Sequence, residues 1–329
     1  MIKSGWISHE VGRKNLLRMQ NHSYNPQPQS AISEHLIASI DKLFFKLRYA
    51  GMNRRQFLAT TAGSLALASL SHAQPKSFSG IIHKAVKVGT SPDEQHFQKV
   101  KDLGFDGVEG NAPGLQVEPM KKVCSRLDLP MHGVVYSKHW QIRLSDPNPE
   151  VREKSREGLA QAMRDARAVG GTSVLLVPGK VMGEQENHQH VWDRSIEQIQ
   201  KLLPLAEELQ IHILIETVWN GFCYMPEQFR DYIDACDSPW VQAYFDIGNM
   251  QKFAPSHEWI RVLGKRTLKL DVKDWGSKNG FCPLGQGDVD WKKVRHELEK
   301  IEFSGWATRE GSDGGIEKTA KLMNELLAL

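Results

Sequence analysis

The sequence lacks several features that would assign it to a common class of binding protein. Its four cysteines include no C-x-x-C pair, so neither a zinc knuckle nor a dithiol redox centre is indicated. The formal net charge of the 329 residues is only +3, which favours neither a nucleic-acid-binding nor a membrane-binding surface. No glycine-rich phosphate loop follows the first predicted strand, and this disfavours a dinucleotide-binding fold.

A short apolar segment has the organisation of an export signal. Arg54 and Arg55 precede a run of small and apolar residues from Leu58 to Leu70, which is too short to span a bilayer. Ser71-His72-Ala73 then supplies a small-x-small cleavage site. This order predicts a twin-arginine signal over 52–73 and export to the periplasm. The alternative is a buried helix in a cytoplasmic protein.

Residues 1–51 precede this signal and include the polar, proline-containing run QNHSYNPQPQS. Because the signal is expected to begin at Met52, we expect 1–51 to be a misassigned or disordered extension. Cleavage after Ala73 would leave 74–329 as the catalytic domain, a length close to the roughly 250 residues of an eightfold α/β barrel.

Strand and helix patterns alternate throughout this expected mature chain. Strands are expected at Ala85–Gly89, Gly107–Glu109, Met131–Val135, Ser173–Val177, Ile211–Thr217, Val241–Asp246, Thr267–Val272 and Gly305–Glu310. Helices are expected in the intervals, for example at Glu150–Val169, Val191–Leu209, Trp291–Ile301 and Ile316–Leu327. The alternation predicts an α/β fold, a single-domain (β/α)8 TIM barrel, rather than an open doubly wound sheet.

The last four predicted strands each end in an acidic residue: Glu216, Asp246, Asp271 and Glu310. Burying a carboxylate at the end of an apolar strand is costly unless it binds a cation or a hydrogen-bond donor. Since active sites of such barrels lie at the carboxyl ends of the strands, we expect the four side chains to converge there. The alternative is four unrelated surface acids.

A set of four carboxylates suits a divalent cation. Mg²⁺ and Mn²⁺ are hard ions that prefer oxygen ligands, whereas zinc usually draws histidine or cysteine. A bound cation would also let the four acids tolerate each other's charge. We therefore predict a Mn²⁺ or Mg²⁺ site on these residues.

The same region resembles the xylose-isomerase-like superfamily of sugar phosphate isomerases and epimerases. ILIETVWN, YFDIGN, LKLDVKD and WATRE are similar to the motifs of strands five to eight, and the likeness covers roughly residues 85–325. The resemblance implies a metal on a Glu, Asp, His, Glu quartet, but Asp271 stands in place of the histidine. Asn249 stands where many members have another histidine. Only His132 and His139 lie near strand ends, which disfavours the histidine-rich endonuclease branch.

The resemblance also implies an activity on a small carbohydrate, with no nucleic-acid partner and no membrane contact after signal removal; oligomer formation is left open. The metal would bind vicinal substrate oxygens and polarise a carbonyl. Glu216 and Glu310 would then act as base and acid at the adjacent carbon, in 1,2-isomerisation or C3 epimerisation. An alternative is lyase or hydrolase chemistry on an oxidised (3-keto) sugar or glycoside, which export favours. A non-catalytic sugar-binding barrel is a third hypothesis, disfavoured because both glutamates are present.

Five further residues are expected at the substrate: His132, Lys273, Asn249, Glu109 and Trp140. His132 would bind substrate hydroxyls or serve as a structural residue. Lys273 shares a face with Asp271 by strand alternation and would pair with acids or bind a substrate oxygen. Trp140, with Trp219 and Trp275, would stack on a sugar or pack beneath loops.

Processing of the N-terminus tests the export hypothesis. We expect N-terminal sequencing of protein from the native host to begin near Gln74, because the expected cleavage site ends at Ala73. Recovery of a chain that still begins at Met1 would contradict it.

Overall fold

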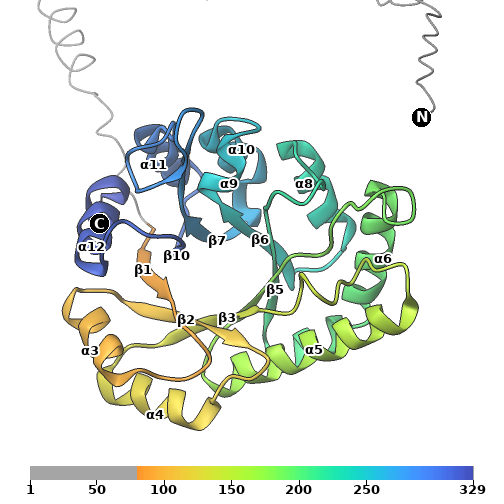
Figure 1. Ribbon diagram of the computed structural model, residues 1–329, viewed down its shortest axis with the longest axis horizontal. Helices are drawn as coiled ribbons and strands as arrows, with labels where there is room; N and C mark the ends of the chain where they lie inside the picture. Colours follow the sequence, from red (N-terminus) through yellow and green to blue (C-terminus); the bar gives the residue numbers. More distant parts are fainter. Residues whose placement is uncertain (1–79, 329) are drawn as a thin grey trace, which may run out of the picture. The chain divides into compact units, whose positions relative to one another are not determined.

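The computed structural model describes residues 80–328. The expected extension and signal, 1–51 and 52–73, lie outside the described residues. Eight parallel strands close into a barrel in the order β1-β10-β7-β6-β5-β4-β3-β2. Figure 1 shows these strands around the centre of the molecule and helices outside them. The predicted TIM barrel is therefore confirmed.

The barrel strands agree with the predicted ones to within a few residues. They are β1 (Ile82–Lys87), β2 (Gly107–Ala112), β3 (Met131–Tyr136), β4 (Ser173–Leu176), β5 (His212–Glu216), β6 (Val241–Asp246), β7 (Thr267–Val272) and β10 (Gly305–Arg309). Two of the predicted acids differ in their position relative to the end of the strand: Asp271 lies inside β7, whereas Glu310 follows β10.

The connecting segments are mostly helical. They comprise α3 (Glu94–Asp102), α4 (Val117–Leu127), α5 (Pro149–Ala168), α6 (His188–Gln200), α7 (Leu203–Leu209), α8 (Pro226–Ala235), α9 (Ile247–Gln251), α10 (Ser256–Leu263), the 3-10 turn η1 (Gly264–Arg266), α11 (Trp291–Lys300) and α12 (Ile316–Leu327). None of the helices within 80–328 is long and apolar enough to cross a membrane.

Local sequence explains where helices begin and end. Asn148 caps α5 by accepting a hydrogen bond from the backbone N–H of Glu150, and Pro149 occupies the first turn, where its missing N–H costs nothing. The single helix predicted over Val191–Leu209 is wrong, because the structure has α6 and α7 there. Pro204 gives the reason: it cannot donate to the carbonyl four residues earlier, where α6 ends.

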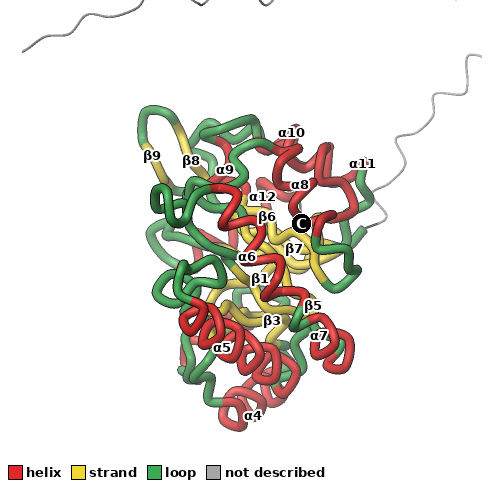
Figure 2. The backbone as a smooth tube through the Cα atoms, turned by 90° about the vertical axis from the view of Figure 1, so that its right-hand side faces the viewer, coloured by secondary structure: helices red, strands yellow, loops and turns green. Residues whose placement is uncertain are grey.

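A short antiparallel hairpin was not predicted. Strands β8 (Asp274–Gly276) and β9 (Gly280–Cys282) pair directly after β7. Figure 2 shows the hairpin beside α9 at one end of the molecule. This places Phe281, at the centre of β9, over the end of the barrel where the acidic residues lie.

The core has two parts of different chemistry. The main apolar cluster fills the space between the strands and the helices. Inside the barrel, a small cluster of Leu175, Leu214 and Tyr244 shares the space with buried polar side chains such as His132 and Lys269. The polar interior needs internal hydrogen bonds, because water does not reach it.

Arg309, the last residue of β10, forms a structural ion pair. It is buried and forms a two-point ion pair with Asp313, with N–O distances of 2.8 and 2.9 Å. Asp313 also accepts hydrogen bonds from the backbone N–H of Leu284 and the hydroxyl of Thr319. One carboxylate thus ties β10 to α12 and to the loop before α11.

Asp313→Ala is expected to lower the free energy of unfolding by about 3–5 kcal/mol, because it leaves a buried guanidinium without its partner. Urea denaturation would measure this loss. Glu118→Ala is the control: it removes an exposed 3.3 Å pair with Lys121 and should cost less than about 1 kcal/mol. Equal losses in the two variants would contradict a structural role for the buried pair.

Candidate active site

The structure brings the four predicted acids together. Carboxylate oxygens of Glu216, Asp246, Asp271 and Glu310 all lie within 4.8 Å of one another. They belong to consecutive strands of the barrel, and the pairing of β6 with β7 sets Asp246 directly beside Asp271. Asp246 and Asp271 are fully buried, whereas Glu310 is partly exposed. The cluster therefore has a buried base and an open side.

Two lysines lie among these carboxylates. Lys87 Nζ is 2.8 Å from Asp271 Oδ2 and 3.3 Å from Glu310 Oε2. Lys273 Nζ is 2.9 Å from Asp246 Oδ2 and 3.0 Å from Glu310 Oε2. Glu310 thus contacts both ammonium groups. Pairing of Lys273 with acids was one of the two roles expected for it.

Lys87 was missed in the sequence. The predicted strand Ala85–Gly89 has Lys87 at its centre, so the search for charged residues at strand ends did not select it. In the structure Lys87 is the last residue of β1, beside Glu109 of β2. The signal that could have identified it is a lone charged residue within an otherwise apolar strand.

Burial and the lysines shift the pKa values of the two glutamates in opposite directions. Burial raises the pKa of Glu216 to about 8; the ammonium of Lys87 opposes this rise and the carboxylate of Glu310 adds to it. Burial alone would also raise the pKa of Glu310, but Lys87 and then Lys273 hold it at about 2. Burial raises the pKa of Asp271 well above its usual range. The two lysines therefore do not fully compensate the cost of ionising all four buried acids, and further positive charge would favour the ionised forms.

Local structure fixes the orientation of Asp246. Its Oδ1 accepts a hydrogen bond of 2.7 Å from the backbone N–H of Asn249, which caps α9. The Asn249 side chain donates to the carbonyl of Thr217 and accepts from Lys273 Nζ at 3.2 Å. Gly248 allows this packing, since a Cβ there would lie 2.7 Å from the carbonyl carbon of Lys273. Asn249 therefore positions both an acid and a lysine.

The donor set fits a divalent cation. Four carboxylates converge, and Asp271 Oδ1 is buried without a hydrogen-bond partner. A buried carboxylate oxygen without a donor is unfavourable unless a cation binds it. All the converging ligands are oxygens, which is the preference of hard ions such as Mg²⁺ and Mn²⁺.

A cavity of about 520 Å³ opens above the cluster. Its lining comprises Lys87, Asn111, Val135, Ser137, His139, Trp140, Glu216, Val218, Trp219, Asn249, Lys273, Phe281 and Glu310. The two glutamates face it, whereas Asp246 and Asp271 do not line it and lie beneath. Of the residues expected at the substrate, Trp140, Asn249 and Lys273 border this space; their binding roles stay predictions.

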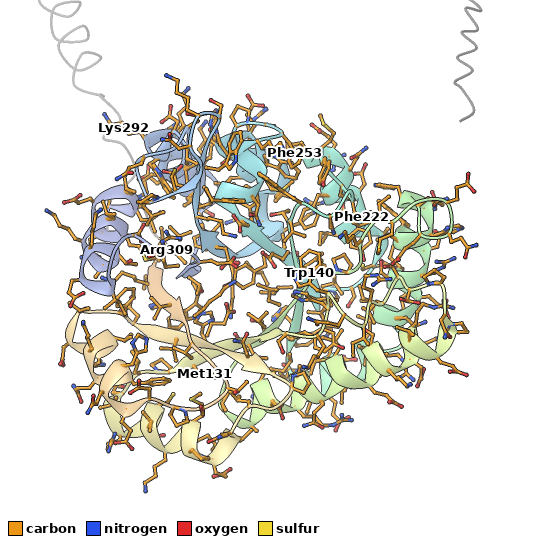
Figure 3. The ribbon with its side chains drawn as sticks, viewed as in Figure 1. Met131, Trp140, Phe222, Phe253, Lys292 and Arg309 are labelled. Carbon is orange, nitrogen blue, oxygen red and sulfur yellow. The ribbon has the colours of Figure 1, made fainter. Side chains whose placement is uncertain are left out.

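Aromatic side chains form the rim of the cavity. Trp140, Trp219 and Phe281 line it with 42%, 37% and 50% of their surfaces exposed. The rings of Trp219 and Phe281 have centroids 4.9 Å apart. In Figure 3 Trp140 lies within the ring of helices, whereas Lys292 lies at the outer edge. Trp275, which was grouped with these tryptophans in the sequence, contacts Trp219 but does not line the cavity.

His132 and Glu109 lie inside the barrel rather than on the cavity wall. His132 Nδ1 is 2.7 Å from Lys269 Nζ, and its ring stacks on Trp306 at 4.4 Å. Glu109 is fully buried and accepts a 3.0 Å hydrogen bond from the hydroxyl of Tyr244. Neither lines the cavity. For His132, this location corresponds to the structural alternative that the sequence left open.

Comparison with known proteins identifies related folds. A family model described as "Xylose isomerase-like TIM barrel" matches residues 97–327. A putative L-ribulose-5-phosphate 3-epimerase of Escherichia coli (strain K12) is 24% identical over 251 residues, covering 69% of this chain and 85% of that protein.

Solved structures show the same fold at lower identity. D-Allulose 3-epimerase from Methylomonas sp., in complex with D-allulose, has a TM-score of 0.59 and 19% identity over 74% of this chain and 88% of that one. The 3-keto-D-glucoside 4-epimerase of E. coli has a TM-score of 0.65 and 15% identity over 76% of this chain and all of that one.

Metal binding tests the carboxylate cluster. Asp246→Asn keeps the oxygen that accepts from the Asn249 N–H but removes a charge, so we expect Mn²⁺ affinity, measured by titration calorimetry, to fall by at least about tenfold. Asp288→Asn, at an exposed aspartate outside the cluster, is the control and should bind as the wild type does. Unchanged affinity in Asp246→Asn would show that Asp246 is not a ligand.

Proposed function

Because the chain belongs to the xylose isomerase-like TIM-barrel family, we propose that it is a sugar isomerase or epimerase acting at a carbon next to a carbonyl. The observation that carries this proposal is the arrangement of Glu216 and Glu310. Both line one cavity directly above two buried aspartates. The related proteins named as 3-epimerases support the same class of reaction.

In this proposal the two glutamates would act from different sides of a substrate. Glu216 ends β5 and Glu310 follows β10, and two strands, β6 and β7, separate them in the barrel. One carboxylate would accept the proton from the carbon and the other would return a proton, which is the division of roles that epimerisation requires. Lys273 and Asn249, which also line the cavity, would bind substrate oxygens.

Glu216, Asp246, Asp271 and Glu310 would hold the metal, for which we propose Mn²⁺ or Mg²⁺. When bound, such an ion supplies Lewis-acid polarisation of the substrate carbonyl. The aspartates would hold it from below, and the glutamates, which line the cavity, would hold it from the side of the substrate. Asn249 would keep Asp246 in position through its backbone N–H.

The lining of the cavity favours a substrate without a phosphate group. Lys87 and Lys273 each contact two carboxylates, and burial lowers the pKa of His139 to about 3, so that it is neutral. A phosphate dianion needs charged donors that are not already paired. We therefore propose an unphosphorylated sugar, which accords with the proposed export through the twin-arginine signal.

The aromatic rim supports a second candidate reaction. Exposed Trp140, Trp219 and Phe281 offer apolar surfaces suited to the faces of a second ring. The cavity, at about 520 Å³, falls in the range of sites that enclose ligands larger than one sugar. Lyase or hydrolase chemistry on an oxidised (3-keto) glycoside would use the same glutamates. Release of the aglycone would distinguish it from epimerisation.

Solvent deuterium incorporation tests the proton-transfer mechanism. With unphosphorylated ketohexoses in deuterated water, the wild type should exchange the hydrogen next to the carbonyl. Glu310→Gln should lower this rate by about 10²–10⁴-fold, because it removes the titrating group. Glu310→Asp should cost about 100-fold, because it displaces the carboxylate by roughly 1 Å.

Glu317→Gln, on the exposed face of α12, is the control for these variants and should exchange at the wild-type rate. Metal content is measured in each sample, since Glu310 is also an expected ligand. Wild-type exchange in a metal-loaded Glu310→Gln variant would rule out the two-glutamate mechanism. Cleavage of a 3-keto glycoside without exchange of ketoses would instead support the second candidate.

A further inference from the structure

Lys87 occupies a place in the cluster that none of the predicted roles explains. It comes from β1, yet its ammonium reaches the acids of two other strands, Asp271 of β7 and Glu310 after β10. Its side chain is 23% exposed and lines the cavity. The ammonium therefore lies beside two of the four expected metal ligands, one fully buried and one that lines the cavity.

The two lysines hold different parts of the cluster. Lys273 pairs with Asp246 and is itself held by the side-chain oxygen of Asn249. Lys87 forms an ion pair with Asp271 at 2.8 Å. When a cation holds all four acids in the ionised form, the four carboxylates and two ammonium groups leave two negative charges, which one divalent cation would neutralise. The arrangement is thus balanced for one such ion and no more.

We propose that Lys87 is a built-in counter-ion that competes with the divalent cation for Asp271 and Glu310 and thereby sets the metal affinity of the site. This inference rests on the metal site proposed above. Lys87 acts as a positioning residue: it holds the two carboxylates together before the metal binds and repels the metal once it is bound.

Repulsion is the stronger of these two effects. Lys87 Nζ is 2.8 Å from Asp271 Oδ2, so a cation bound by the same carboxylate would lie within a few ångströms of the ammonium. At that separation in a partly buried site, like charges interact strongly. Holding the carboxylates together matters less in the loaded site, because the cation then neutralises them itself. Removal of the ammonium should therefore strengthen metal binding.

Titration calorimetry with Mn²⁺ alone tests this inference. Lys87→Met removes the charge and keeps a flexible apolar chain, and we expect its affinity to rise by about tenfold or more. Lys87→Gln is a second neutral variant and should show the same rise, in case the first fails to fold. Lys87→Arg keeps the charge and should bind within about threefold of the wild type.

Lys84→Met is the matched control. Lys84 lies on the same strand and is buried, but its ammonium donates a 2.7 Å hydrogen bond to the side-chain oxygen of Asn324 instead of pairing with the four acids. Its loss should leave Mn²⁺ affinity unchanged. Circular dichroism confirms folding of every variant before titration.

The outcomes separate this inference from the proposed metal site. Tighter binding in both neutral variants, with Lys87→Arg and Lys84→Met unchanged, supports the inference. If the wild type binds Mn²⁺ and the two neutral variants bind it equally well or more weakly, the inference is overturned but the proposed metal site stands. Failure of the wild type and all variants to bind Mn²⁺ overturns both. Binding that appears only when Lys87 is neutralised supports the inference.

Discussion

Four carboxylates within 4.8 Å of one another are the constraint on which this end of the barrel depends. Like charges at this spacing repel strongly in a buried site, so positive charge must lie among them. Lys87 and Lys273 provide part of it by contacting three of the four acids directly. Gly248 then lets α9 pack against Lys273, which places the backbone N–H of Asn249 on Asp246.

The interior of the barrel supports this cluster from below through hydrogen bonds. Thr308 pairs in register with Asp271, and its hydroxyl bonds both His132 and Tyr244. Lys269 Nζ continues the network to His132 and to the hydroxyl of Ser173 at 2.6 Å. These hydrogen bonds make the interior rigid, because a displaced member would leave its partners buried and unpaired. A rigid interior holds the carboxylates above it in a fixed geometry.

The aromatic rim of the cavity and the charged cluster come from different parts of the fold. The carboxylates come from strand ends, whereas the aromatic rim comes from the loops that follow β3 and β5 and from the β8–β9 hairpin. This separation is typical of the fold, in which loops vary on a conserved barrel. A change in the rim would therefore alter the shape of the cavity without moving the carboxylates.

The sequence by itself determined the barrel and the position of its acidic residues. Alternation of apolar strands with amphipathic helices depends on local periodicity, and an acid at a strand end is visible in one dimension. The break between α6 and α7 at Pro204 is also a local feature of the sequence, although a single helix was predicted there. Only the tertiary structure decided which charges meet. Lys87 and Asp271 are 184 residues apart, and closure of the barrel alone brings β1 within reach of β7. The same closure placed His132 and Glu109 in the interior network, since the depth of a side chain along the barrel axis depends on the stagger between strands, which no single segment encodes.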